Sequence, residues 1–352
     1  MLQIYLPIAE VTINVASLLI ISVVVGFFAG LLGIGGGFLL TPILIFLGIP
    51  PIYAVANGAN NILAASVSGT LGHWFKDQLD IKMGLLIVAG GILGSIFGII
   101  LFKFFIAQGI VNNIISLMYC TLLTSIGISM LIESLIEIRR IKLNRFIRRK
   151  LHKHYWLHNL PFKIRIHKSK LYTSVIPPIF FGILVGILSS MLGVGGGFLL
   201  VPIMIYILGM PARLVAGTSL FVMIFIMIIV IFLHALSLNT VDILLVMILV
   251  VGSVIGAQLG TKIGSKLRSE ELRAMMSILV LIFGFKFGYD LLFHKIIPSV
   301  GITTTAKPID MGILNDFILY ASQNFPASYA ITSMLIAILV GIIAAFSFKR
   351  FL

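Results

Sequence analysis

The sequence predicts an all-α membrane protein, a polytopic helical bundle built from two inverted repeats with glycine-broken helices. The first reason is composition: 60% of the 352 residues are hydrophobic and only 10% are charged, whereas a soluble domain carries about 25% charged residues. The second is that several apolar runs reach the roughly 20 residues that a helix needs to cross a bilayer. The third is a glycine-rich stretch that occurs twice, which indicates an internal duplication.

The repeated stretch reads LLGIGGGFLLTPILI at residues 31–45 and MLGVGGGFLLVPIMI at residues 191–205. The offset is 160 positions, and it extends to Pro51 and Pro211. Glycine and proline both oppose helix continuation. Each copy therefore predicts a helix that is interrupted at the glycines and resumes after them.

Residues 1–137 are expected to form an N-terminal membrane repeat. Its first apolar run covers 12–32, and the run after the glycines covers only 38–48. A helix of that length extends about 17 Å and cannot cross a bilayer alone. These two runs predict a broken helical hairpin, or a helix followed by a re-entrant half-helix. Full spans are predicted over 54–75, 82–104 and 110–135.

Residues 138–174 are expected to form a basic cytoplasmic loop. They contain twelve Lys and Arg and no Asp or Glu, and thus carry most of the net charge of +14. Cytoplasmic loops of membrane proteins are enriched in Lys and Arg, and such loops also contact anionic headgroups. The concentration of charge in this one loop argues against nucleic acid as a partner.

Residues 175–293 are expected to form a C-terminal membrane repeat, and residues 294–352 a polar extracytoplasmic segment followed by a final transmembrane helix. Each repeat contains a glycine-broken pair that returns to its own side and three full spans. This odd count inserts the two repeats upside down relative to each other. It also places the C-terminus, with Lys349 and Arg350, in the cytoplasm. The expected location is the cytoplasmic (inner) membrane, with the lipid bilayer around a multi-pass protein. The predicted runs of the second repeat and of the last helix are 175–192, 198–209, 214–236, 241–262, 272–293 and 327–348.

The two glycine clusters are the first candidate site. Short glycine-interrupted segments at matching positions of two halves indicate the binding site of a transporter, and N–H groups at a helix start attract anions. The sequence therefore predicts a site for a small anionic substrate between the two breaks. Glycines at helical spacing elsewhere, such as Gly90, Gly94, Gly252 and Gly256, are interpreted as helix packing. The candidate substrate-binding glycines are Gly35, Gly36, Gly37, Gly195, Gly196 and Gly197.

Polar residues inside the predicted spans are the second candidate group. Asn57, Asn60 and Asn61 open one span, and Thr218 and Ser219 open its counterpart. Amides and hydroxyls are neutral, directional donors that suit substrate binding, although hydrogen bonds between helices explain them equally well.

His73 and His234 lie near the far ends of the same two spans. Histidine titrates near neutral pH, so both are candidates for a proton relay. The alternative is that they cap helices at the membrane interface.

The pattern Gly-x-Gly-Gly-Gly-Phe-Leu-Leu-x-Pro, which occurs twice among apolar spans, resembles the TauE/SafE (TSUP) family of membrane transporters. The likeness covers about residues 15–290. It implies movement of sulfite, sulfoacetate or other sulfonates or organic anions, often outward, across the cytoplasmic membrane. The long basic loop and the segment after 294 depart from the family pattern.

The expected function is therefore a secondary transporter that exports a small anion by alternating access. A proton or sodium ion is a candidate for coupling, and unpaired carbonyls of the broken helices are candidate cation ligands. Neither a Walker-type motif of an ATPase nor the His-Glu-x-x-His motif of a metalloprotease occurs, and no enzymatic activity is predicted. No cofactor, metal site or particular oligomer is predicted either. The alternatives are an anion channel, and a membrane anchor that recruits a partner through its basic loop.

Overall fold

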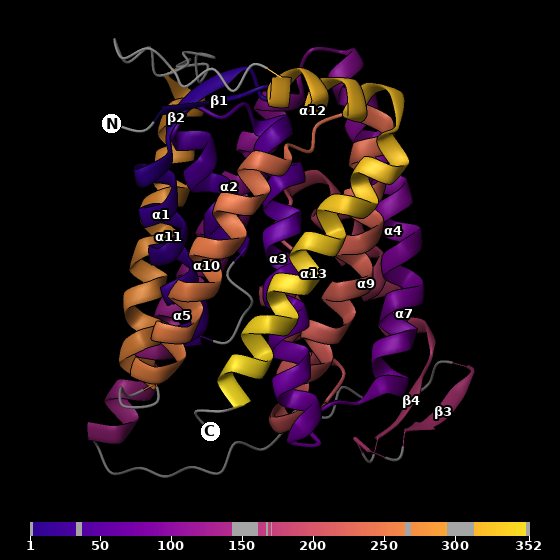
Figure 1. The fold of residues 1–352 in the computed structure, drawn as a ribbon. Coiled ribbons are helices and arrows are strands. Elements are labelled where there is room, and N and C mark those ends of the chain that lie inside the picture. Colours follow the sequence, from indigo (N-terminus) through magenta and orange to yellow (C-terminus); the bar gives the residue numbers. More distant parts are fainter. Residues whose placement is uncertain are drawn as a thin grey trace.

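The computed structural model describes residues 3–32, 37–142, 161–166, 168–169, 171–264, 269–293 and 313–349. The helices run roughly along one common direction and form a single bundle (Figure 1). In the first half the elements are β1 (Gln3–Leu6), β2 (Val11–Asn14), α1 (Val15–Leu32), α2 (Gly37–Phe46), α3 (Pro51–Phe75), α4 (Ile81–Ala107) and α5 (Val111–Lys142). In the second half they are β3 (Lys163–Ile166), β4 (Leu171–Ser174), α7 (Ile176–Leu192), α8 (Gly197–Pro202), the π-helical turn η1 (Ile203–Ile207), α9 (Ala212–Leu238), α10 (Ile243–Gly264) and α11 (Ser269–Leu292). The chain then adds α12 (Ile313–Asn324) and α13 (Pro326–Lys349).

These helices confirm the prediction of an all-α, multi-pass membrane protein. Within the described residues, five helices are long and apolar enough to cross a membrane: α4, α5, α9, α10 and α13. The central helix α3 is less apolar than these because its surroundings are protein. It contacts α2, α9, α10 and α13, and most of its side chains are buried. A helix enclosed by other helices can carry polar groups that a lipid-facing helix cannot.

Both interrupted helices occur where the glycine clusters predict them. α2 begins at Gly37 and α8 at Gly197, and α2 has only 10 residues. In the second half the regular helix is shorter, because α8 ends at Pro202 and the chain continues as the π-helical turn η1. Pro42 occupies the matching position inside α2, which continues to Phe46, so proline alone does not explain the difference.

The halves pack through matching helix pairs. α1 contacts α10, and α4 contacts α7, while α3 and α5 contact α9 and α11. Under the 160-residue correspondence, α1 matches α7 and α4 matches α10, so the first two contacts are counterparts of each other. The last two each join a helix to its own counterpart. A two-fold relation between the halves produces this pattern. The pattern supports the predicted inverted repeat, which itself stays a prediction.

Glycines make the closest helix contacts, as their helical spacing predicts. A Cβ at Gly94 would lie 2.1 Å from the carbonyl oxygen of Ile183 in α7. In the counterpart pair, a Cβ at Gly256 would lie 1.9 Å from the carbonyl oxygen of Val23 in α1. Neither position has room for a side chain, so the two backbones touch. This confirms the packing interpretation for these two glycines.

Each half begins with a β-hairpin that the sequence did not predict. β1 pairs with β2 from Gln3–Asn14 to Leu6–Val11, and β3 pairs with β4 from Lys163–Ser174 to Ile166–Leu171. The two registers are related by the same offset of 160 positions. The hairpins lie at opposite ends of the bundle (Figure 1), which we call the β1–β2 end and the β3–β4 end. Strands of four residues are too short for hydrophobic alternation to reveal them.

Two boundaries predicted from the sequence need correction. The interval 138–174 is not wholly a loop, because α5 continues to Lys142 and the β3–β4 hairpin occupies the other end of the interval. The polar segment 294–326 contains the helix α12, which lies across the β1–β2 end (Figure 1). One side of α12 faces the bundle: Ile318 and Ser322 are buried, whereas Phe317 and Tyr320 are exposed. The sequence of α12 mixes polar and apolar residues, so it did not show the continuous apolar run of a membrane-spanning helix.

Candidate functional site

The second glycine break is built from left-handed backbone. Gly193, Gly195 and Gly196 have φ angles of 62°, 76° and 55°, a region that glycine enters without a Cβ penalty. Space is restricted as well. A Cβ at Gly193 would lie 2.4 Å from the carbonyl oxygen of Val55 in α3, and a Cβ at Gly195 would lie 2.9 Å from the side chain of Ile62. The break therefore needs glycine for both conformation and contact with α3. Gly35 and Gly36 of the first break lie outside the described residues.

Carbonyl oxygens at the end of α7 are bound by side chains from other helices. His234 Nε2 lies 2.8 Å from the carbonyl oxygen of Ser190, and the Tyr119 hydroxyl donates to the carbonyl of Leu192. The Thr41 hydroxyl of α2 donates to the carbonyl of Gly193 over 3.3 Å. The protein itself therefore satisfies these three carbonyls, which were candidates for holding a cation. The contact of Thr41 with Gly193 also brings α2 of the first half against the break of the second.

The N–H side of the same break is different. Within the described residues, no hydrogen-bond acceptor is found for the N–H groups of Gly195 and Gly196. The Ser189 hydroxyl is fully buried without a partner, and its oxygen lies 3.5 Å from the position of a Cβ at Gly196. Ser66 also has a fully buried hydroxyl without a partner, and it follows Ile62 by one turn on the same face of α3. Unpaired buried polar groups are rare because each costs about 1–3 kcal/mol. Several such groups lie together here. They indicate a site where a bound ligand would accept the hydrogen bonds that these groups can donate.

The three candidate asparagines of α3 face different neighbours. The Asn57 side chain accepts the N–H of Asp242 at 2.8 Å and donates to the carbonyl of Thr240 at 3.2 Å. The Asn61 side-chain oxygen accepts a hydrogen bond from the Ser253 hydroxyl of α10. Asn60 makes only a 3.4 Å bond to a carbonyl of its own helix, and its fully buried side-chain oxygen has no partner. The amide groups of Asn57 and Asn61 therefore join helices, and Asn60 alone keeps an unused buried oxygen.

The hydroxyl candidates of α9 show a related arrangement. Thr218 accepts the N–H of Asp80 at 3.0 Å and donates to the carbonyl of Leu214. Ser219 donates to a carbonyl of its own helix, that of Ala216. Thr218 and Asn57 thus play matching parts at opposite ends of the bundle, because each accepts the N–H of an aspartate that precedes a fourth helix. The hydrogen bonds described above for these two side chains do not involve the glycine break.

The two histidines differ in burial. His73 is partly exposed near the end of α3, where its Nδ1 lies 3.0 Å from the Gln78 side-chain oxygen. His234 is fully buried, its Nε2 faces the carbonyl of Ser190, and its Nδ1 has no partner. Binding to a carbonyl requires a proton on Nε2, so Nδ1 is left as an acceptor in the neutral ring. His234 touches the glycine break, and His73 does not.

Asp80 and Asp242 were missed by the sequence reasoning. Each immediately precedes the fourth helix of its half, and each caps that helix: Asp80 Oδ1 accepts the N–H of Met83, and Asp242 Oδ1 accepts the N–H of Leu244. Both are buried. Burial raises the pKa of the Asp242 carboxyl, and backbone N–H donors, foremost that of Ile8, act in the opposite direction. The signal was present in the sequence, because the chain has only 11 acidic residues and the pair Asp-Ile occurs at both positions.

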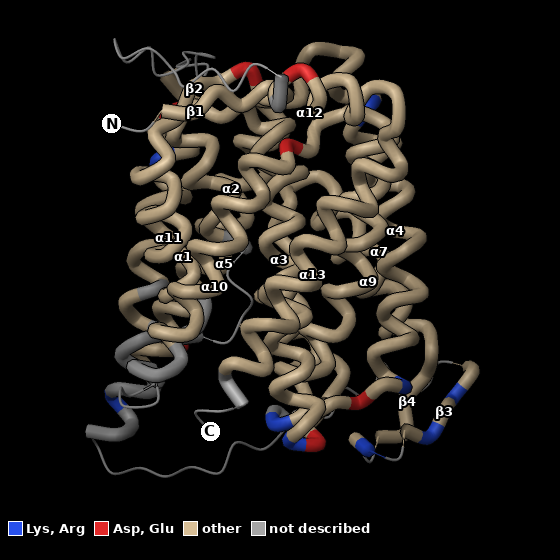
Figure 2. Tube along the Cα trace, viewed as in Figure 1, with Lys and Arg blue, Asp and Glu red and all other residues tan. Residues whose placement is uncertain are grey.

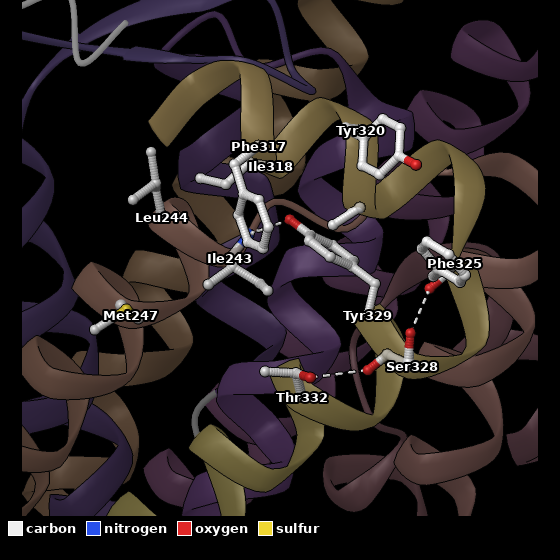
Figure 3. Close-up of a pocket in the computed structure, with 11 residues that line it drawn as sticks. Ile243, Leu244, Met247, Phe317, Ile318, Tyr320, Phe325, Ser328, Tyr329 and Thr332 are labelled. Carbon is white, nitrogen blue, oxygen red and sulfur yellow. Dashed lines mark hydrogen bonds between the residues drawn. The ribbon is translucent and has the colours of Figure 1, made fainter. Parts of the chain in front are cut away.

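A pocket lies away from the break, between α10, α12 and α13 (Figure 3). Its volume is about 670 Å³, and its lining is mainly apolar, with Met247, Phe317 and Phe325 among the residues. Tyr329 also lines it, and its hydroxyl accepts the N–H of Ile243 at 3.1 Å. None of the residues predicted to bind substrate lines this pocket. An apolar surface of this kind does not suit an anion.

Comparison with known proteins adds a decisive observation. A family model described as "Sulfite exporter TauE/SafE" matches residues 18–287. The chain belongs to this family. The match includes both glycine stretches, all the candidate site residues and both capping aspartates. It ends before α12 and α13, which nevertheless belong to the bundle, because a Cβ at Gly341 of α13 would lie 2.5 Å from the carbonyl oxygen of Ala64 in α3.

Curated relatives of this TauE/SafE-family protein carry transporter names. It is similar to "Probable membrane transporter protein YjnA" of Bacillus subtilis (strain 168), with 26% identity over 271 residues, which are 77% of this chain and 98% of the relative. It is also similar to "Probable membrane transporter protein YunE" of the same organism, with 27% identity over 218 residues, which are 58% of this chain and 73% of the relative. No solved structure matches the chain significantly. Family and fold together identify a multi-pass membrane protein of a transporter family.

Proposed function

We propose that this TauE/SafE-family protein is a secondary transporter that exports a small anion across the cytoplasmic membrane by alternating access. The substrate class is sulfite, a sulfonate or a related organic anion, in keeping with the description of the family model. The proposed site lies at the glycine breaks. The observation that carries the proposal is the set of hydrogen-bond donors at the second break that have no acceptor among the described residues.

The donors at the break suit an oxyanion. The N–H groups of Gly195 and Gly196 and the Ser189 hydroxyl are neutral. Neutral donors bind an oxyanion with direction but without the strong attraction of a Lys or Arg, so the anion can also leave. Gly197, Gly35, Gly36 and Gly37 complete the proposed site through the correspondence of the two repeats. Asn60 is proposed to assist from α3 because its buried amide NH₂ group makes only a long bond, of 3.4 Å, to the carbonyl of Ala56.

The charge distribution supports the proposed orientation. Most of the described Lys and Arg lie at the β3–β4 end of the bundle (Figure 2). They include Lys76, Lys82 and Arg213, which lie outside the basic loop, at helix ends. The positive-inside rule then makes the β3–β4 end cytoplasmic and the β1–β2 end extracytoplasmic.

Occupied carbonyls at the end of α7 favour a proton over sodium as the coupling ion. A sodium site in a broken helix uses free carbonyl oxygens, but those of Ser190, Leu192 and Gly193 already accept side-chain donors. His234 contacts this site and retains an unpaired ring nitrogen. We therefore propose His234, rather than His73, as the first residue to consider in a proton relay.

The test is anion binding by purified protein, followed as a rise in melting temperature with sulfite, sulfate, thiosulfate, sulfoacetate, taurine and chloride. An anion present at 100 times its dissociation constant stabilises the folded protein by about 2.7 kcal/mol. The decisive variant is Ser189→Ala. Ser189 has no hydrogen bond to lose, so this change should leave the melting temperature without anion unchanged or higher, but should reduce the shift produced by the anion.

Ser190→Ala is the matched control. Ser190 is equally buried, but its hydroxyl already donates to carbonyls of its own helix, those of Gly186 and Ile187. Its removal should leave the shift produced by the anion intact. The proposal fails if no anion raises the melting temperature, or if the two variants reduce the shift equally. Anion flux into proteoliposomes also separates a carrier from a channel. Unlabelled anion on the opposite side of the membrane accelerates the exchange of labelled anion through a carrier, but not through a channel.

A further inference from the structure

Two aspartates each join three structural elements at one end of the bundle. At the β3–β4 end, Asp80 caps α4 through Oδ1, while its Oδ2 accepts the N–H of Ser169 at 3.0 Å and also the Ser169 hydroxyl. Ser169 belongs to the turn between β3 and β4. The N–H of Asp80 in turn donates to Thr218 of α9. Asp80 therefore joins the hairpin and the start of α4 through its buried carboxylate, and α9 through its backbone N–H.

Asp242 forms the same junction at the β1–β2 end. Its Oδ1 caps α10, and its Oδ2 accepts the N–H of Ile8, in the turn between β1 and β2, at 3.2 Å. Its N–H donates to Asn57 of α3. Asp242 thus joins the hairpin and the start of α10 through its carboxylate, and α3 through its backbone N–H. The two junctions are made of corresponding elements, and in each the hairpin of one half binds the aspartate of the other.

The hairpins also place apolar side chains at the helix ends. Ile8 and Ile166 are both buried in one hydrophobic core, which also contains Ala56 of α3 and Leu214 of α9. Ala56 and Leu214 lie in the first turns of their helices. Each hairpin therefore lies beside the start of one of these helices, at one end of the bundle.

We propose that Asp80 and Asp242 are positioning residues of the transport cycle that act as side-specific latches, each holding one hairpin closed over one end of the path to the glycine break. This inference rests on the proposed transport function, and it adds how the two sides of the membrane are closed. Both latches are engaged in this structure. Release of the Asp80 latch opens the β3–β4 end, and release of the Asp242 latch opens the β1–β2 end.

Asp→Asn substitution separates the latch from the helix cap. Asparagine caps helices about as well as aspartate, so Oδ1 continues to accept the N–H groups of α4 or α10. The amide NH₂ then takes the place of Oδ2 and cannot accept the N–H of Ser169 or Ile8. Asp80→Asn and Asp242→Asn therefore weaken one hairpin contact each, while both helix caps are kept.

The experiment measures access to the break from each side. Cys120 is the only cysteine of the chain, so a Cys120→Ser background leaves no thiol. The reporter is Ser66→Cys, because Ser66 is buried and its hydroxyl has no bond to lose. A membrane-impermeant maleimide is added to one side of proteoliposomes of known orientation, without any substrate. Asp80→Asn should raise labelling from the β3–β4 end, and Asp242→Asn from the β1–β2 end, each by about tenfold, which corresponds to the loss of a hydrogen bond to a charged group.

The opposite sidedness of the two variants distinguishes a latch from a merely structural contact. Equal labelling from both sides in each variant, or no change in either, overturns the proposal. A second measurement covers variants that unfold: cysteines at Ser169 and Asp80 are joined by oxidation in the Cys120→Ser background. This crosslink should block labelling from the β3–β4 end only, and block transport. Labelling that is unaffected by the crosslink also overturns the proposal. Because labelling needs no substrate, side-specific labelling with no anion-dependent melting shift would reject the proposed substrate class and leave the latches in place.

Discussion

The hydroxyl of Tyr119 in α5 donates a hydrogen bond to the carbonyl of Leu192, the last residue of α7, across 73 positions of sequence. Tyr119 is fully buried and stacks on Phe287 of α11, with 5.1 Å between the ring centroids. A carbonyl at a helix end has no N–H partner within the helix. Tyr119 therefore supplies the hydrogen-bond donor that the carbonyl of Leu192 lacks because α7 ends at the glycine break. This contact joins the helix pair α5–α11 to the candidate site.

Tyr119→Phe should therefore destabilise the protein while the ring packing is kept. The change leaves the buried carbonyl of Leu192 without a donor, at a cost of about 1–3 kcal/mol. The measurement is thermal unfolding in detergent. Tyr289→Phe is the control, because Tyr289 is 53% exposed. Equal melting temperatures for the two variants would show that the Tyr119 hydroxyl contributes nothing to the break.

Two glycine-to-alanine changes should have opposite signs. Gly94→Ala places a methyl group 2.1 Å from the carbonyl oxygen of Ile183, so α4 and α7 must separate, and overpacking of this kind costs about 1–3 kcal/mol. Gly72 of α3 has open space around its Cβ position, and alanine in a helix is favoured over glycine by about 0.5–1 kcal/mol. Gly94→Ala should lower the melting temperature and Gly72→Ala should raise it. A rise for both would contradict the close contact of α4 with α7.

His234→Ala and His234→Gln should differ in stability. Alanine leaves the buried carbonyl of Ser190 without its donor, with a loss of about 1–3 kcal/mol, whereas the glutamine amide can still donate to it. Thermal unfolding compares the two variants. If His234 relays protons, anion flux through His234→Gln should lose its dependence on pH, even though the protein remains folded. A glutamine variant with the same pH profile as the wild type would exclude the relay.

Neighbouring residues of the β3–β4 turn should contribute unequally to stability. Lys168 forms an ion pair with Asp77, but the two side chains are 40% and 87% exposed, and exposed pairs contribute at most about 0–1 kcal/mol. Ser169 donates to a buried carboxylate, where hydrogen bonds to charge contribute about 1.5–3 kcal/mol. Ser169→Ala should lower the melting temperature clearly more than Lys168→Ala. A larger decrease in melting temperature for Lys168→Ala than for Ser169→Ala would show that the ion pair stabilises the hairpin more than the buried hydrogen bond does.

Sequence predicted the membrane helices well because their signals are long and local. The predicted spans 82–104 and 214–236 lie within α4 and α9, and α2 and α8 begin at the last glycine of each cluster. The early start of α3 at Pro51 follows from proline at the first helical position. Hydrophobic length, glycine and proline act over a few neighbouring residues, so no knowledge of packing was needed.

The hairpins and the partners of the polar residues were beyond the sequence. Gln3 and Lys163 begin corresponding strands but differ in charge, and Tyr5 corresponds to Arg165, so the repeat is preserved here more in geometry than in residue type. Asn57 was recognised as a polar residue inside a span, but its contact with Asp242 joins positions 185 residues apart. Side-chain partners at that separation depend on tertiary packing, which no local pattern carries.

Each hairpin binds the aspartate of the other half of the chain, and this has a consequence for a protein that contains only one half. The first half supplies the hairpin for Asp242, and the second half supplies the hairpin for Asp80. One half alone would therefore have both a hairpin without an acceptor and an aspartate without a donor. Two copies of that half could satisfy both only by associating in opposite orientations across the bilayer. A single-repeat protein of this design would have to be a dual-topology dimer, and fusion of its two copies would fix the orientation that free subunits must find by chance.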